Sequence, residues 1–133
     1  MDDDFWTLLH SEIPPKARPA FEAQLYADAV EAALKVVQQM IRDRTDLDLD
    51  GVKLMNEAFS PNNPCLVVNA SGTETAKSMQ EGYHRIFQGV ILAIRNPKAH
   101  GFVSISKNRC VHFLFFASML AFTVEEATDA RRA

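Results

Sequence analysis

The chain has 133 residues, of which 47% are hydrophobic and 23% are charged. This composition is typical of a globular domain and excludes a disordered or low-complexity chain. The net charge of −3 argues against a generic nucleic-acid binder that depends on an overall positive charge. The length predicts one domain, residues 1–133, with enough apolar residues for a core.

The N-terminal residues 1–4 are mostly acidic, unlike the basic start of a secretory signal peptide. The longest apolar stretch, residues 110–124, is shorter than the roughly 20 residues of a spanning helix. Cys65 and Cys110 lie beside apolar residues, as buried thiols do, and two cysteines without paired histidines do not make a zinc site. We therefore expect a cytoplasmic protein with no membrane association, metal or cofactor.

The first third of the chain predicts helices. Residues 5–13 predict a short helix or turn that ends at Pro14 and Pro15. Residues 19–44 predict one long helix, because apolar residues recur at three- and four-residue steps and Pro19 suits a first turn. Together with the helices expected further on, these elements predict an all-α fold, a bundle of about four helices.

The acidic segment before residue 51 resembles a calcium loop. Asp46, Asp48, Asp50, Gly51 and Glu57 match EF-hand positions 1, 3, 5, 6 and 12. However, a lysine takes the place of the usual aliphatic residue at position 8, and the chain holds no second copy. Residues 51–59 also predict a helix of their own. We therefore interpret the segment as an acidic turn.

Two short runs rich in β-prone residues predict a small ribbon. Residues 65–69 follow a proline-rich turn, and residues 102–105 form the second run. The simplest arrangement pairs the two runs with each other against the helical bundle.

Residues 74–95 predict the second long helix, with Thr73 as its N-cap. Gly82 and Gly89 lie seven residues apart on one side of it. Because glycine costs about 1 kcal/mol inside a helix, we expect both to mark the close approach of another helix.

Residues 107–127 predict the last long helix, with Ser106 as its N-cap. The helix is apolar on two sides and must be covered on both. Two arrangements remain open: a second copy of the chain covers the outer side, or residues 5–13 fold over it. The first favours a homodimer with this helix in or beside the interface.

Positive charge is concentrated in residues 74–113, which hold six basic and two acidic residues. A local basic surface can therefore exist on an acidic protein. Within it, the candidates for RNA binding are His84, Arg85, Lys98, Lys107 and Arg109.

The most informative stretch is residues 91–100, an apolar run that stops at Pro97 and leaves Arg95, Asn96 and His100 together. Arginine offers a planar fork of donors that suits phosphate. Histidine transfers protons near neutral pH. A histidine base beside an arginine clamp is what metal-independent phosphodiester cleavage needs. The alternative is an arginine at a helix C-terminus followed by a loop histidine.

The sequence resembles a known family over residues 5–127. The residues that carry the resemblance are Gly51-x-x-Leu54-Met55-x-x-Ala58-Phe59, Gln80-Glu81-Gly82, Phe87-x-Gly89 and Arg95-Asn96-Pro97-x-Ala99-His100. They are similar to the Ymh-type family of hypothetical bacterial proteins, which resembles the HEPN superfamily of small helical ribonucleases.

This resemblance implies a dimeric helical bundle in which two Arg-x4-6-His motifs meet near the interface and cleave RNA without a metal. Arg95, Asn96 and His100 would hold the catalytic positions. It also implies a role in toxin–antitoxin or antiviral defence systems, with an antitoxin or defence-system partner. A non-catalytic helical dimerisation or nucleotide-binding module remains the alternative, because many HEPN proteins are inactive.

Overall fold

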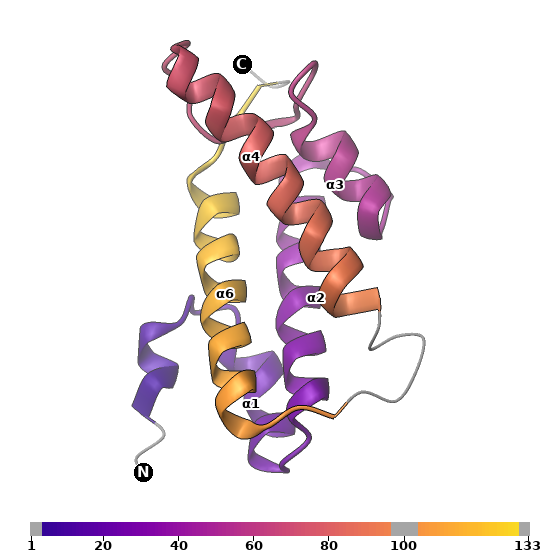
Figure 1. Cartoon of the computed structure of the whole chain (residues 1–133), viewed down its shortest axis with the longest axis vertical. Helices are drawn as coiled ribbons and strands as arrows, with labels where there is room; N and C mark the ends of the chain where they lie inside the picture. Colours follow the sequence, from indigo (N-terminus) through magenta and orange to yellow (C-terminus); the bar gives the residue numbers. More distant parts are fainter. Residues whose placement is uncertain (1–3, 97–103, 131–133) are drawn as a thin grey trace.

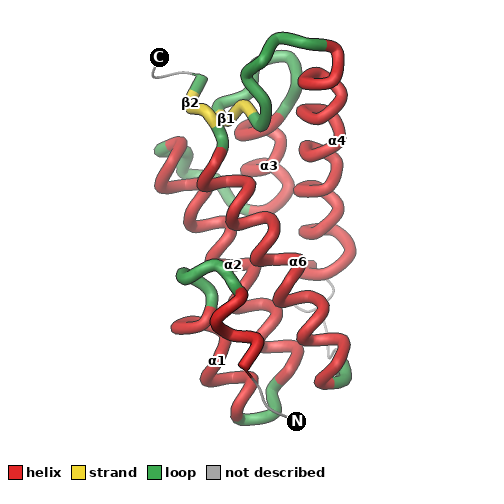
Figure 2. The backbone as a smooth tube through the Cα atoms, turned by 90° about the vertical axis from the view of Figure 1, so that its left-hand side faces the viewer, coloured by secondary structure: helices red, strands yellow, loops and turns green. Residues whose placement is uncertain are grey.

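A computed structural model describes residues 4–96 and 104–130. In chain order its elements are the 3-10 helix η1 (Asp4–Leu8), α1 (Pro14–Glu22), α2 (Tyr26–Thr45), α3 (Gly51–Phe59), β1 (Leu66–Val67), α4 (Glu74–Val90), the π-helical turn η2 (Ile91–Arg95), α6 (Lys107–Glu126) and β2 (Thr128–Asp129). The predicted all-α class is confirmed (Figure 1), and the small ribbon expected beside the helices is present (Figure 2).

The prediction of one helix over residues 19–44 is wrong, because the helix is interrupted between α1 and α2. Gln24 has a φ of 61°, a left-handed conformation that no helix can continue through. The two prolines at 14 and 15 begin α1 and do not merely end the preceding segment, since a missing N–H costs nothing in the first turn of a helix. As a result α1 folds back against α2.

The helix α2 lies at the centre of the bundle, packed against α1, α3 and α6. Its apolar face, which includes Val30, Leu34, Val37 and Ile41, is buried along the whole helix. The helices α3 and α4 pack on each other through the stacked rings of Phe59 and Phe87, whose centroids are 4.1 Å apart. Figure 2 shows this pair at the ribbon end of the molecule.

The ribbon exists, but its predicted pairing is wrong. β1 pairs with β2 in antiparallel register, Leu66 opposite Asp129 and Val67 opposite Thr128. Of the predicted partner, residues 102 and 103 lie outside the described chain, and residues 104 and 105 are not in a strand. The reason is geometric: the 20-residue helix α6 is about 30 Å long and separates residue 105 from the end that reaches β1.

Both predicted N-caps are confirmed. The side chain of Thr73 accepts a hydrogen bond from the Ala76 N–H at 3.1 Å, and that of Ser106 accepts one from the Arg109 N–H at 3.1 Å. The expected close approach at Gly82 and Gly89 is wrong for the described chain, because a Cβ at either position would meet nothing within 4 Å.

The outer side of α6 is covered in part by the N-terminal segment. The ring of Phe5 lies 6.1 Å from that of Phe115, and the ring of His10 lies 4.7 Å from that of Phe122. The backbone N–H of His10 also donates to the Ser118 hydroxyl at 2.8 Å. A row of α6 stays exposed nonetheless: Phe115 is 37%, Met119 42% and Phe122 40% exposed. None of the described helices has the length and apolar character required to cross a membrane.

Candidate functional site around Arg95

Arg95 is the last residue of the π-helical turn that follows α4. The α-helical bonding of α4 changes at Ile91 to the wider π pattern, so that the Asn96 N–H donates to the Ile91 carbonyl, five residues back. Turns of this kind are rare and occur frequently at functional sites. The prediction that the helix ends near Arg95 or Asn96 stays a prediction, because Asn96 is still helical and the residues after it lie outside the described chain.

The guanidinium of Arg95 is mostly covered but poorly paired. Its side chain is 23% exposed, and its Nη2 donates to Asp50 Oδ2 at 3.4 Å. A strong bond between these charged groups is shorter, about 2.7–2.9 Å. The Nε of Arg95 is buried and has no hydrogen-bond partner among the described residues. A buried donor without an acceptor costs free energy. The site is therefore suited to a ligand that brings a hydrogen-bond acceptor.

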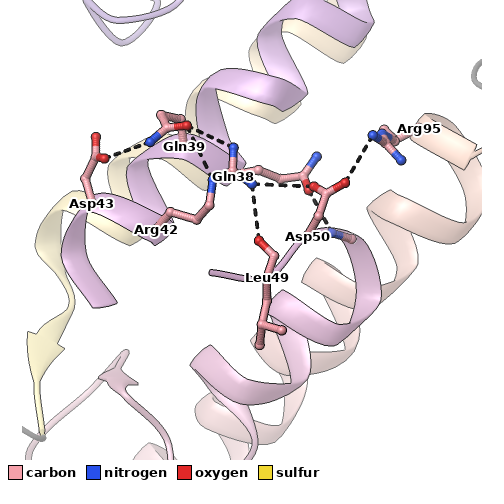
Figure 3. A network of polar contacts seen from close by, with 8 residues as sticks. Gln38, Gln39, Arg42, Asp43, Leu49, Asp50 and Arg95 are labelled. Atoms are coloured by element: carbon pink, nitrogen blue, oxygen red, sulfur yellow. Dashed lines mark hydrogen bonds and ion pairs between the residues drawn. The ribbon is translucent and has the colours of Figure 1, made fainter. Parts of the chain in front are cut away.

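Asp50 also contacts a second arginine. Its Oδ1 accepts from Arg42 Nη1 at 3.5 Å, and Arg42 donates in turn to the Gln39 side chain at 3.0 Å. Gln39 donates to Asp43 at 2.8 Å. Figure 3 shows this chain of polar contacts running from α2 to η2. One carboxylate therefore lies between two guanidinium groups.

The position of Asp50 is fixed by the start of α3. The side chain of Gln38, which is 2% exposed, accepts a hydrogen bond from the Gly51 N–H at 3.0 Å (Figure 3). Gly51 has a φ of 62° and directs the chain into α3, a conformation that glycine adopts without strain. Of the EF-hand-like residues, Gly51 thus forms the start of a helix and Asp50 contacts two arginines.

Arg95 borders two cavities. One, of about 230 Å³, is lined mostly by apolar residues from α2, η2 and α6, together with Glu31 and Arg109. The other is an open groove of about 510 Å³ between α1, α2 and Asp50. Because Arg95 lies between them, a group that binds in either cavity can reach its guanidinium.

Of the predicted RNA-binding residues, only Arg109 lies beside Arg95 in the described chain. Arg109 lines the smaller cavity, and its guanidinium lies 5.6 Å from the centre of the Phe113 ring. The ammonium of Lys107 lies 5.8 Å from the centre of the Phe21 ring, toward α1. Lys98 and His100 are outside the described residues. Asn96 is half-buried and directly follows η2 in a helical conformation.

His84 and Arg85 belong to a different surface. Arg85 pairs with Glu81 at 2.7 Å, and the ring of His84 bonds to Asn56 of α3 at 2.9 Å. Ten residues of helix separate Arg85 from Arg95, about 15 Å along the axis. Burial, and to a smaller degree the positive charge of Arg85, lowers the pKa of His84 below its ordinary value. The neutral form of His84 is therefore favoured at pH 7.

Sequence reasoning missed three basic residues near Arg95, namely Lys16, Lys35 and Arg42. All three line the larger groove. Lys35 and Arg42 are seven residues apart, two turns along α2, which is a detectable signal for a shared face. Lys16 could not be found in this way, because its place depends on the break at Gln24.

The described residues contain no group of three or more His, Cys, Asp or Glu side chains that could hold a metal ion. Both thiols are buried, and burial raises the pKa of Cys110 to about 12, so this thiol is not a nucleophile at neutral pH. The chemistry available around Arg95 is therefore hydrogen bonding and positive charge directed at an anion.

Comparisons with known proteins give one match. Neither the curated proteins nor the solved structures contain a significant match to this chain. A family model described as "Protein of unknown function (Hypoth_ymh)" matches residues 7–124. The match covers most of the chain, including every described helix from α1 to η2 and nearly all of α6. The chain belongs to the Hypoth_Ymh family.

Proposed function

We propose that this protein is a metal-independent endoribonuclease of the HEPN type. The observation that supports the proposal most is the state of Arg95: a largely covered guanidinium with one long contact to Asp50 and a buried Nε without a partner in the described chain. An RNA phosphate supplies the acceptor oxygens that these donors lack.

The proposed reaction uses the 2′-hydroxyl of RNA as its own nucleophile. His100 takes the proton of the 2′-OH, and the 2′-oxygen forms a bond to phosphorus while the bond to the 5′-oxygen breaks. Arg95 stabilises the negative charge that develops on the phosphate oxygens. Asn96 orients His100 or hydrogen-bonds the phosphate. The products are a 2′,3′-cyclic phosphate and a 5′-hydroxyl.

The leaving 5′-oxygen needs a proton, which the His100 of a second copy can give. We therefore include a homodimer in the proposal, with α6 in or beside the interface. The exposed row of Phe115, Met119 and Phe122 supports it, because large exposed apolar patches are unusual on monomers. This row is about 200° around the helix from Phe113, which faces the Arg95 cavity. A shared cleft therefore needs a further contact near η2, where Leu92 is 59% exposed.

We also propose the biological setting implied by the sequence resemblance, a toxin or antiviral defence system in the cytoplasm. In that setting the protein has an RNA substrate and an antitoxin or defence-system partner. The partner's task is to hold the ribonuclease inactive until the system is triggered.

The test is cleavage of a mixed RNA pool in EDTA by the wild-type protein, His100→Ala and Arg95→Ala. We expect wild-type cleavage with cyclic phosphate ends, no cleavage by either variant, and intact DNA of the same sequence. Equal cleavage by all three proteins, or none by the wild type, overturns the proposal. In the second case the alternative, a non-catalytic dimerisation or nucleotide-binding module, is tested by measuring ATP and ADP binding.

A further inference from the structure

The larger groove beside Arg95 carries an excess of positive charge. Its lining comes from α1, α2, the residue before α3, and η2, and consists of Lys16, Ala32, Lys35, Val36, Gln38, Gln39, Arg42, Asp50 and Arg95. Four of these residues are basic and one is acidic. The whole chain has a net charge of −3, so the groove is a local positive surface on an acidic protein.

We propose that this groove binds the phosphodiester backbone of single-stranded RNA and leads it to Arg95. The inference deepens the proposed function, on which its assignment to an RNA substrate rests. It assigns the substrate path to Lys16, Lys35 and Arg42, none of which the sequence motif includes.

The positive charges of the groove are only partly neutralised within the protein. Asp50 is shared by Arg42 and Arg95, at 3.5 Å and 3.4 Å, so one negative charge faces two positive charges. Lys35 has a 3.4 Å contact with Glu31 and a side chain 61% exposed, an arrangement that stabilises little in water. Lys16 forms no ion pair with any described residue. An incoming polyanion therefore displaces only weak contacts.

The spacing of the charges fits a chain of phosphates better than one phosphate. Lys35 and Arg42 are seven residues apart on α2, about 10 Å along the axis. Lys16 and Arg95 come from two other elements, α1 and η2. Arg42 and Arg95 reach the same Asp50 carboxylate and so can hold one phosphate between them. Lys16 and Lys35 then remain for the neighbouring phosphates of an extended strand.

The remaining lining also favours a backbone over a free nucleotide. Apart from the charged side chains, the described lining holds only Ala32, Val36, Gln38 and Gln39, with no aromatic ring. Base recognition in single-stranded sites relies on stacking against aromatic rings. The volume of about 510 Å³ is that of a small-molecule site, too small to enclose a duplex. A short run of sugar–phosphate units satisfies both conditions.

The test measures binding without cleavage. A fluorescent single-stranded RNA is titrated in EDTA with His100→Ala as the background, alone and with Lys16→Glu and Lys35→Glu combined. Both lysines are exposed, so the fold is expected to survive. We expect roughly a tenfold or greater loss of affinity, and a smaller slope of log affinity against log salt, by about 0.7 for each lost contact.

The matched control combines Lys53→Glu and Lys77→Glu, two exposed lysines of α3 and α4 that make the same change of charge and do not line the groove. Equal affinity of the groove variant and this double control overturns the inference. A competition arm uses ATP and inorganic phosphate: if either displaces RNA at concentrations near the Kd of RNA, the groove is a nucleotide or phosphate site and the inference fails.

The two proposals fail separately. If the groove variant loses binding but the wild-type protein never cleaves RNA, the groove assignment stands and the nuclease does not. If the wild type cleaves RNA, and the groove variant binds as well as its His100→Ala background and, with His100 restored, cleaves as well as the wild type, the nuclease stands and the groove assignment is wrong.

Discussion

Asp50 and Arg95 are 45 residues apart in sequence, yet the Arg95 guanidinium donates to the Asp50 carboxylate at 3.4 Å. This contact joins the start of α3 to the end of η2, and Arg42 extends it to α2 (Figure 3). The Asp50 side chain is 58% exposed. It is therefore accessible, and its carboxylate occupies the guanidinium donors that a phosphate would use.

Replacing Asp50 with asparagine is expected to strengthen RNA binding. The substitution keeps the size of the side chain but removes the negative charge that competes with phosphate for Arg42 and Arg95. We expect an affinity several-fold higher in the His100→Ala background, measured by fluorescence anisotropy. The free energy of unfolding should change by less than about 1 kcal/mol, because exposed ion pairs contribute little.

The control for this substitution is Glu74→Gln, which removes one negative charge from an exposed pair with Lys77 at the start of α4. An equal gain in affinity from Glu74→Gln would mean that only the net charge matters. Weaker binding by Asp50→Asn would show instead that the carboxylate holds the arginines in their binding positions.

Replacing Arg95 with alanine should abolish cleavage and leave the protein folded. Its one ion pair is long, and its buried Nε makes no bond to a described residue, so the folded state loses few contacts. We expect a change of less than about 1 kcal/mol in the free energy of unfolding, measured by urea denaturation. A large fall in stability would identify Arg95 as a structural residue at the end of the helix.

Replacing Arg44 with alanine should have the opposite profile, a loss of stability without a specific loss of activity. Its guanidinium donates to the carbonyls of Val124 at 2.6 Å and Ala127 at 2.7 Å, at the end of α6. Removing these bonds takes a donor from the Ala127 carbonyl and leaves the Val124 carbonyl with only the 3.3 Å bond from the Ala127 N–H. We expect a cost of about 1–3 kcal/mol in a thermal or urea melt.

The comparison for Arg44→Ala is Arg85→Ala, which removes an exposed pair with Glu81 within one helix. Such a pair is worth only about 0.3–0.5 kcal/mol. Equal melting of the two variants would show that the contacts of Arg44 at the end of α6 contribute no more than a surface pair.

The sequence predicted helices well where apolar periodicity and a capping residue agreed. The helices that begin after the caps Thr73 and Ser106 are examples. It failed where a single residue overrides the pattern: the left-handed Gln24 divides one predicted helix into two, although the apolar period continues on both sides. The predicted pairing of the ribbon was wrong for another reason. Which strands pair depends on where the long helices place the segments that follow them.

For the candidate site, local sequence identified Arg95 but not its surroundings. The contacts of Asp50, Arg42 and Lys16 near Arg95 depend on how α1, α2 and α3 are packed, which no short motif records. Conversely, the basic residues near Arg95 in sequence include Arg85, which faces another surface and pairs with Glu81. Proximity along the chain was therefore a poor guide to proximity in space.

His84 should titrate below its ordinary pKa of 6.5. Burial disfavours its charged form, and the positive charge of Arg85 adds a smaller effect in the same direction. Because the unfolded chain binds this proton more readily, the folded state loses stability as the pH falls through 6.5, and has no such loss above it. An NMR titration of the His84 ring measures the midpoint directly.

In Arg85→Gln the His84 midpoint should rise but stay below 6.5, because burial is the larger cause. The Glu81 carboxylate, freed from Arg85, adds to this rise. A midpoint at or above 6.5 in the wild-type protein would contradict the burial of the ring between α3 and α4.

The last prediction concerns assembly. Met119 lies at the middle of the exposed row on α6, is 42% exposed, and is flanked by Phe115 and Phe122. A charge there should be tolerated by a monomer but not by an apolar interface. We expect wild-type dimers and Met119→Glu monomers in light scattering at micromolar concentration, with unchanged circular dichroism.

Leu92→Glu is the paired variant, because Leu92 is 59% exposed on η2, three residues before Arg95. If two chains share a cleft at Arg95, this variant should lose cleavage even where Met119 is intact. If only the α6 row joins the chains, Leu92→Glu should remain a dimer with wild-type cleavage, and each Arg95 then acts alone. A stable wild-type monomer at micromolar concentration would rule out the dimer, and with it proton donation by a second His100.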